Sequence, residues 1–424
     1  MPTIRIQNIG PLADTGEVRV APVTLVIGPQ SSGKSTLMKL LCFCVWVEKH
    51  VMLDDSQFLN DYTHYNRFRR MLGKFHRLDS TFFSPESRLR YEGEAVIIEL
   101  QGQRSNARIT RKAGFTAARH NEKVCYLPAE RNLISALQNA ERAYRTNDVD
   151  ELFNYIVEWN DARTSFPPER PLPMVFDANL HYCYESSRRR DMLLLVDQGK
   201  RVPTFNASSG VQSAIPVTGM ADYVERCVGQ VGSYTPHDLL QREQSLLARG
   251  PRRSAAAQPV ADVRAEARHD VEELFRYRAF RLFVEEPEQN LFPRSQYELV
   301  RDLVRRVRRT NLDQEGPGSS LVLTTHSPYV LTVLNVLLLA AQAAKRDARA
   351  TERVVPSEFQ LPAADFAAYG ITDDRRLETL TDPETGLVKG EWLDAVSDIV
   401  DEQTYRLNSI LYGDEEGPAD EAGA

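Results

Sequence analysis

Residues 28–36 have the sequence Gly28-Pro29-Gln30-Ser31-Ser32-Gly33-Lys34-Ser35-Thr36, which fits the pattern GxxxxGK[ST]. The apolar residues 23–27 precede this stretch and predict a strand, and residues 34–47 follow it with helical periodicity. A strand, a glycine-rich turn and a helix in this order form the context in which the pattern holds phosphate groups. A glycine-rich turn without a ligand is the alternative, but these flanks favour a phosphate loop.

The residue types of this loop suit a nucleotide. Its glycines allow backbone N–H groups to close around β- and γ-phosphates, and the helix N-terminus adds a favourable potential for an anion. Lys34 is then expected to bridge the phosphate oxygens, and the hydroxyl of Ser35 to bind Mg²⁺. The sequence therefore predicts ATP and Mg²⁺ as ligands.

Two adjacent carboxylates end a second apolar run far downstream. Residues 280–284 predict a buried strand, and Glu285 and Glu286 follow directly, before Pro287. At a strand tip the first carboxylate can hold a metal ion, directly or through water, and the second can orient and deprotonate an attacking water. A Glu-Glu pair can also be a solvated turn, but the phosphate loop in the same chain favours the catalytic interpretation.

Two weaker patterns accompany these motifs. His326 follows the strand expected at residues 320–324 and could contact a γ-phosphate, although a single histidine is more often a structural residue. Ser208-Ser209-Gly210-Val211-Gln212 places hydroxyl groups and a glycine at an expected helix start. Such a start attracts anions, but an ordinary helix cap has the same residue types.

Composition limits the remaining classes of function. The 424 residues are 42% hydrophobic, which excludes general disorder, and the net charge of −7 argues against a coat for nucleic acid. Five cysteines without a CxxC pair, and an amino terminus without a signal peptide, predict a cytoplasmic protein. The longest apolar stretch, residues 333–344, is too short to span a membrane. One basic and aromatic cluster remains a candidate contact for DNA or RNA: Arg67, Arg69, Arg70, Lys74, His76 and Arg77.

The order of the four motifs resembles the ABC-type ATPase heads shared by SMC, RecF and OLD-family proteins. By this resemblance, residues 28–36 are the Walker A loop, and Glu285 takes the Walker B metal position, with Glu in place of the usual Asp as in OLD-like members. Glu286 is the catalytic base and His326 the switch histidine. Residues 288–291 stand for the D-loop, and Ser208, Ser209, Gly210 and Gln212 for the signature motif. The resemblance implies a homodimer, or a higher homo-oligomer, in which each ATP lies between the Walker motifs of one subunit and the signature of the other.

The chain also resembles compact ATPases of bacterial anti-phage defence systems, including Septu-type and related AAA ATP-binding proteins. The segment Tyr126-Leu-Pro128-Ala-Glu130-Arg131 is similar to their Pro-Ala-Glu-Arg segment, so Glu130 and Arg131 stand where ABC heads carry the Q-loop. This resemblance implies a sensor or regulatory ATPase that controls a separate effector protein, such as a nuclease, because no nuclease motif is found in the chain itself. A RecF- or SMC-like ATPase of DNA repair or replication is the alternative, and a transporter-type head is the least favoured.

The expected fold is α/β: a P-loop NTPase of the ABC-ATPase head type, with a mostly parallel sheet flanked by helices, an antiparallel β lobe and a helical insertion. The expected head is discontinuous and comprises residues 1–50, 120–135 and 205–411. Residues 51–119 are expected to form an inserted aromatic, basic and β-rich lobe, and residues 136–204 a helical insertion that leads to the signature motif. Residues 249–262 are expected to be a mobile linker, and residues 412–424 a disordered acidic tail.

Overall fold

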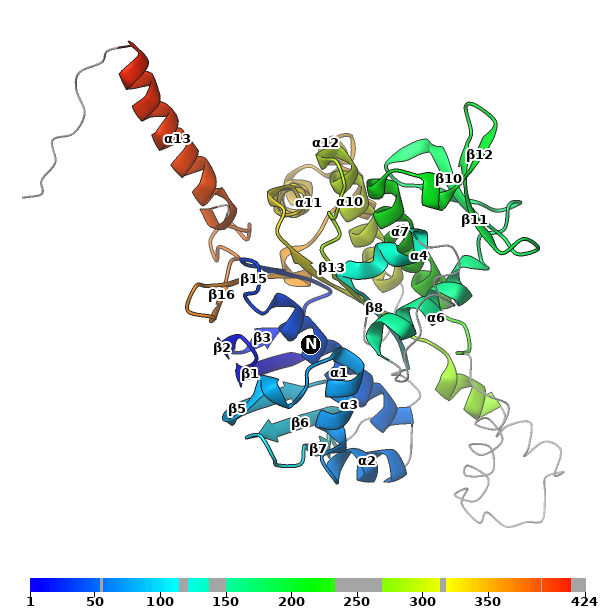
Figure 1. Ribbon diagram of the computed structural model, residues 1–424, viewed down its shortest axis with the longest axis vertical. Coiled ribbons are helices and arrows are strands. Elements are labelled where there is room, and N and C mark those ends of the chain that lie inside the picture. The colour runs from blue at the N-terminus through cyan, green and yellow to red at the C-terminus, as the bar shows by residue number, and fades with distance from the viewer. Residues whose placement is uncertain are drawn as a thin grey trace, which may run out of the picture.

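The computed structural model describes residues 1–53, 56–113, 121–136, 150–232, 269–312, 318–389 and 391–412. The expected linker, residues 249–262, lies outside these ranges, as does the expected acidic tail apart from Tyr412. The strands form three sheets. In Figure 1 the sheet that contains β13 lies in the middle of the molecule, between the sheet of β1 and β5 and the sheet of β10 and β11.

The central sheet contains the strands on which the sequence motifs lie. Its spatial order is β16 (Leu377–Thr379), β15 (Phe366–Ile371), β4 (Val23–Ile27), β14 (Ser320–Thr325), β13 (Ala279–Glu285) and β8 (Glu122–Leu127). All pairings are parallel except that of β16 with β15. Each residue of β4, β13, β14 and β15 is buried, which explains why these strands are nearly continuous apolar runs.

Alternate residues of the central strands face two separate cores. On β13, Leu282 and Val284 pack into one core, and Phe283 packs into the other. The first core includes the buried faces of four helices: α6 (Glu151–Arg163), α7 (Ser209–Cys227), α10 (Pro293–Asn311) and α11 (Pro328–Arg346). The second core includes the buried residues of α1 (Lys34–Leu53). The central sheet is therefore covered on both faces, and its strand ends remain accessible for a site.

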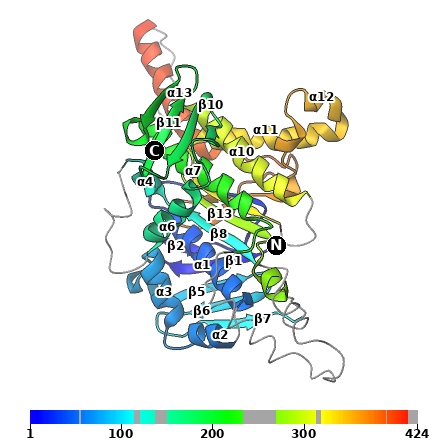
Figure 2. The ribbon, with the colours of Figure 1, turned by 90° about the vertical axis from the view of Figure 1, so that its right-hand side faces the viewer.

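The second sheet is antiparallel and combines two segments of the chain. Its order is β2 (Leu12–Asp14), β1 (Thr3–Ile9), β5 (Phe83–Glu92), β6 (Val96–Gln101) and β7 (Arg108–Arg111), with β3 (Val18–Arg19) on β1. Because β1 pairs with β5, the expected boundary at residue 50 does not separate two sheets. The helices α2 (Ser56–Thr63) and α3 (Arg67–His76) lie beside α1 at this end of the molecule (Figures 1 and 2).

The third sheet corrects the expectation of a helical insertion over residues 136–204. Within the described part of that range α6 is helical, as is the single turn α4 (Leu133–Ala136) at its edge. Four antiparallel strands follow: β9 (Leu172–Met174), β10 (Asp177–Glu185), β11 (Arg190–Leu195) and β12 (Lys200–Pro203). The physical reason is the alternation on β10, where Leu180, Tyr182 and Tyr184 are buried and join the first core beside Trp159.

The remaining helices lie near the carboxyl terminus. The short α12 (Ala348–Glu352) follows α11, and α13 (Glu391–Tyr412) extends away from the body in Figure 1. By length and composition α11 could cross a membrane. Its buried side chains, however, belong to the first core, which is the arrangement of a core helix. The molecule as a whole confirms the expected α/β class, with parallel pairing in the central sheet and antiparallel pairing in the other two.

Candidate functional site

The glycine-rich loop joins β4 to α1 at the carboxyl end of the central strands. Gly33 has a φ of 112°, which only glycine adopts readily, and a Cβ added there would lie 2.7 Å from Leu12 Cδ2. Ser31 has a φ of 57°, and its carbonyl oxygen accepts a hydrogen bond of 2.6 Å from Arg375 Nη1. The loop is therefore a tight turn, held from outside by a side chain from the turn after β15. Pro29, Gln30 and Ser35 are exposed and Thr36 is buried.

Lys34 folds back over the loop that precedes it. Its Nζ donates to the carbonyl oxygens of Gly28, at 2.8 Å, and Pro29, at 2.7 Å. Burial lowers the pKa of Lys34 to about 8, whereas the negative charges of Glu286, Glu288 and Glu285 raise it. The loop lysine and three carboxylates of the β13 turn thus belong to one electrostatic environment.

Ser32 supplies a direct test of whether an anion fits this loop. Its side chain is 1% exposed, and its Oγ has no hydrogen-bond partner among the described residues. A Cβ on Gly28 would lie 2.9 Å from that oxygen, so the glycine leaves open the space beside it. A buried hydroxyl without a partner is unfavourable, and a bound phosphate oxygen would satisfy it. The residues present therefore fit a phosphate group.

Glu285 ends β13 and is held by the strand next to it. Tyr126 Oη donates to Glu285 Oε1 at 2.7 Å, and the backbone N of Ala129 donates to Oε2 at 3.1 Å. The side chain is buried, and each carboxylate oxygen keeps a further lone pair. No group of three or more His, Cys, Asp or Glu side chains in the described ranges could hold a metal ion alone. The assignment of Ser35 and Glu285 to Mg²⁺, which would take its other ligands from phosphate and water, stays a prediction.

Arg131 contacts the backbone of the two glutamates at the end of β13. Its guanidinium is 0% exposed and donates to the carbonyl oxygens of Glu285, at 2.5 Å, and Glu286, at 2.6 Å. It also donates to the carbonyl oxygen of Ser213 in α7 at 3.3 Å. Arg131 is therefore a clamp on the backbone of the β13 turn. Its neighbour Glu130 is exposed, and its assignment to a Q-loop stays a prediction.

Glu286 and His326 come together from neighbouring strands. The distance from His326 Nε2 to Glu286 Oε1 is 3.3 Å, and about a third of each side chain is exposed. Glu286 has a φ of 45°, an unfavourable conformation for this residue type, and strain of this kind often marks a functional site. Glu288 Oε1 accepts hydrogen bonds from Thr325 Oγ1 and the backbone N of His326, both at 2.8 Å. The β13 turn thus positions the start of the segment after β14.

The signature residues begin α7 and pack against the same turn. Ser208 caps the helix without a side-chain hydrogen bond, and Ser208 and Ser209 are exposed. A Cβ on Gly210 would lie 2.6 Å from the carbonyl oxygen of Asn290, which shows how closely the helix approaches the turn. Gln212 instead donates to the carbonyl oxygens of Thr204 and Phe205. No hydrogen bond within the described ranges joins residues 208–212 to the phosphate loop.

The structure also identifies contributors that sequence reasoning did not single out. Tyr126 anchors Glu285, Glu288 anchors the backbone of His326, and Arg375 holds the phosphate loop. Tyr126 lies near the end of β8, two residues before Pro128, and this position could have indicated a role at the sheet edge. Arg375 carries no such signal because its contact with Ser31 spans most of the chain.

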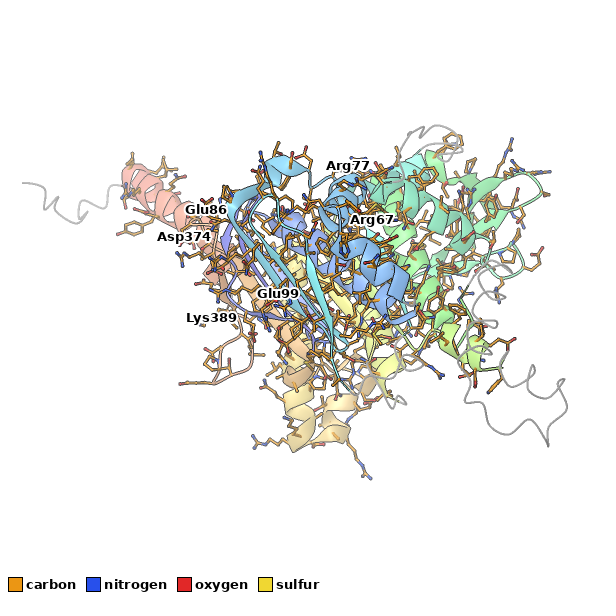
Figure 3. The ribbon with its side chains drawn as sticks, turned by 90° about the horizontal axis from the view of Figure 1, so that it is seen from below. Arg67, Arg77, Glu86, Glu99, Asp374 and Lys389 are labelled. Atoms are coloured by element: carbon orange, nitrogen blue, oxygen red, sulfur yellow. The ribbon has the colours of Figure 1, made fainter. Side chains whose placement is uncertain are left out.

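The basic cluster of residues 67–77 is largely used inside the protein. Arg69 is buried and donates to backbone carbonyls of residues 101–105, and His76 is 1% exposed. Figure 3 labels Arg67 and Arg77, which flank α3, and each is paired with an aspartate of the chain, Asp61 and Asp150. Arg70, Lys74 and Arg77 are the exposed cations of the cluster.

Comparisons with known proteins give only distant structural neighbours. No protein-family model and no curated protein matches the chain. An SMC head bound to the C-winged helix domain of ScpA aligns at 8% identity with a TM-score of 0.38, over 89% of this chain and 96% of that one. The SMC head domain from Thermotoga maritima aligns at 10% identity with a TM-score of 0.34, over 89% of this chain and 97% of that one. A third neighbour is the Pyrococcus furiosus SMC head with an extended coiled coil, bound to the C-terminal domain of ScpA. It aligns at 8% identity with a TM-score of 0.35, over 95% of this chain and 100% of that one. These neighbours have the ABC-type ATPase fold, and the roles assigned below rest on the geometry of this chain alone.

Proposed function

We propose that this protein binds and hydrolyses ATP with Mg²⁺ as an ABC-type ATPase head. The observation that carries the proposal is the meeting of the phosphate loop with Glu285, Glu286 and His326 at one edge of a parallel sheet. The loop follows β4, the carboxylates follow β13, and β14, which leads to His326, lies between them. The carboxyl ends of parallel strands are where α/β folds bind their ligands.

Each residue of the site has a distinct task in this proposal. Lys34 exchanges the carbonyl oxygens of Gly28 and Pro29 for β- and γ-phosphate oxygens. Ser35 and Glu285 hold Mg²⁺, which neutralises phosphate charge when it is bound. Glu286 accepts a proton from the attacking water, and His326, 3.3 Å away, orients that carboxylate and contacts the γ-phosphate.

The signature residues are proposed to act on a nucleotide of a second subunit. Their support is geometric: Ser208 and Ser209 are exposed at the N-terminus of a long helix, where backbone N–H groups and the helix dipole favour an anion. Because their own phosphate loop is not bonded to them, these donors are available to a partner. ATP would then join two heads in a head-to-tail homodimer, or in a higher homo-oligomer built from the same contact.

The test is a pair of substitutions with opposite outcomes. Lys34→Ala should abolish ATP binding, measured by calorimetry, because it removes the charge that faces the phosphates. Glu286→Gln should keep ATP binding, lose hydrolysis by a factor of about 10² or more, and accumulate an ATP-dependent dimer in light scattering. A Glu286→Gln protein that hydrolyses ATP normally and stays monomeric would overturn the role given to Glu286. Hydrolysis by Lys34→Ala at the wild-type rate would overturn the site itself.

The wider role that we propose is regulatory. The similarity of residues 126–131 to defence ATPases supports a cytoplasmic sensor that controls a separate effector protein, such as a nuclease. A RecF- or SMC-like role in DNA repair or replication is the alternative. Stimulation of ATP hydrolysis by DNA or RNA, weakening steeply with salt, would favour direct contact with nucleic acid. A complex that forms with an effector nuclease from a neighbouring gene, and with no nucleic acid, would favour the regulatory role.

A further inference from the structure

A cavity of about 540 Å³ lies on the side of α1 that faces α3, β8 and α6. Figures 1 and 2 show α6 next to α1 and α3. The volume is within the range of pockets that hold small organic molecules. The cavity is separate from the phosphate loop, and none of residues 28–36 lines it.

The apolar wall of this cavity is mostly aromatic. Phe43 and Trp46 of α1 stack with ring centroids 5.8 Å apart, and both line the cavity together with Phe75, Tyr126 and Tyr277. Flat ring faces provide a large contact area for a planar ring and bind it by offset stacking or edge contacts. The shape and composition of the wall therefore favour an aromatic ligand over a flexible aliphatic one.

Lys49 gives the cavity an unbalanced positive charge. Its Nζ lies 5.0 Å from the centroid of the Tyr277 ring, and no hydrogen bond or ion pair joins it to another residue in the described ranges. Burial, together with the nearby charge of Lys123, lowers the pKa of Lys49 to about 8, while the charges of Glu158 and Glu122 act in the opposite direction. Lys123 also lines the cavity, but it pairs with Glu158 at 3.1 Å. An anionic group would supply the partner that the Lys49 ammonium lacks.

Two elements connect the cavity with the phosphate site. The ring of Tyr126 lines the cavity, and its hydroxyl donates to Glu285 Oε1 at 2.7 Å. The helix α1 begins at Lys34 in the phosphate loop and carries Phe43, Trp46 and Lys49 on the cavity wall. A ligand packed against these residues would restrict both the orientation of Glu285 and the position of α1.

We propose that this cavity binds a small aromatic anion, with its ring against the aromatic wall and its acidic group on Lys49, and that occupancy changes the affinity for nucleotide. The claim that the anion binds depends on the cavity residues alone. The coupling part rests on the proposed function, since it requires that ATP binds at the phosphate loop. By reciprocity, nucleotide then changes the affinity of the anion by the same factor.

The binding test uses 8-anilinonaphthalene-1-sulfonate, whose fluorescence increases in apolar sites, and the neutral 1-anilinonaphthalene as its matched control. Both are titrated into the nucleotide-free full chain. We expect saturable binding of one sulfonate per chain, about tenfold or more tighter than the neutral compound. Lys49→Met should remove this preference, and Asn154→Trp, at the α6 side of the cavity, should weaken both compounds. Lys200→Met, which removes an exposed lysine of β12, should leave both affinities unchanged.

The outcomes separate binding from coupling. Equal affinities of wild type and Lys49→Met for the sulfonate, in variants whose thermal unfolding is unchanged, would overturn the site. For coupling, the Kd of ATP is measured by calorimetry with and without saturating sulfonate, and a change of about threefold or more is expected in the wild type but not in Tyr126→Phe. An unchanged Kd in the wild type overturns the coupling. If the wild type binds no ATP, the proposed function fails and the coupling fails with it, while the sulfonate titration still decides the cavity.

Discussion

The phosphate loop and the signature segment both present the N-terminus of a long helix, but they are built in opposite ways. The loop before α1 is closed on itself: Lys34 is bonded to its carbonyls, Ser32 is buried, and Arg375 holds it from outside. The segment before α7 exposes both serines and has no side-chain cap. The loop before α1 is thus closed by contacts within the chain, whereas the segment before α7 presents exposed hydrogen-bond donors. In the proposed function, this difference means that one anion site is formed within the chain and that the other is completed by a partner.

The largest effect is expected at Arg131, which joins α7 to the β13 turn. Arg131→Met removes the donors to the carbonyls of Glu285, Glu286 and Ser213 and leaves buried acceptors without partners. We expect the free energy of unfolding in urea to fall by about 3–5 kcal/mol. Arg90→Met is the control, because Arg90 forms its ion pairs on the surface and should lose less than about 1 kcal/mol. Similar losses in the free energy of unfolding for the two variants would contradict the role of Arg131 in holding the β13 turn.

Gly33→Ala tests the closed region. A side chain at a φ of 112° is strained, and its Cβ would meet Leu12, so the loop must open. ATP affinity should fall by about 100-fold or more, with a loss of about 1–3 kcal/mol in stability. Calorimetry and urea unfolding measure the two quantities. A variant that binds ATP as tightly as the wild type would show that the loop is not a pre-formed cradle.

Gly210→Ala is the matching change in the open region. The backbone angle there is ordinary for a helix, so only the contact of 2.6 Å with the Asn290 carbonyl must be relieved. We expect a loss of about 1–2 kcal/mol in stability and an ATP affinity of the monomer within about twofold of wild type. The comparison with Gly33→Ala is the control. If both glycine variants lost ATP binding equally, the distinction between the two regions would be wrong.

The smallest effect on the single chain is expected from the double change Ser208→Ala and Ser209→Ala. Both hydroxyls are exposed, and Ser208 forms no cap hydrogen bond, so stability should change by less than about 0.5 kcal/mol. The ATP-dependent dimer of the Glu286→Gln protein should nevertheless be lost, as measured by light scattering. Persistence of that dimer would exclude these hydroxyls from the partner contact.

Local sequence was sufficient to predict the central strands of the site. Residues 23–27, 280–284 and 320–324 are nearly continuous apolar runs because they are buried on both faces of a parallel sheet, and a residue type with a distinct chemistry follows each run. The motif residues therefore meet at one edge for a reason that the sequence expresses locally.

Other contacts could not be predicted because their partners are distant in the chain. Glu285 is positioned by Tyr126, and the phosphate loop by Arg375, and no local pattern encodes either pair. The strand β10 was missed although Leu180, Tyr182 and Tyr184 alternate with more polar residues, because the preceding helical pattern and prolines dominated the interpretation. The basic residues of the segment 67–77 are a candidate contact for nucleic acid by sequence, but Arg67 and Arg77 form ion pairs within the chain.

The position of β4 in the central sheet has a consequence for biosynthesis. This strand is made early, but its two sheet neighbours are β14, which ends at Thr325, and β15, which ends at Ile371. Until these late segments leave the ribosome, the strand that precedes the phosphate loop has no hydrogen-bonded neighbour, and Arg375 is not available to Ser31. The nascent chain must therefore keep an apolar strand unpaired through most of its synthesis, which exposes it to aggregation and to chaperones. In the proposed function, nucleotide binding would in turn report that β14 and β15 have been made and paired with β4.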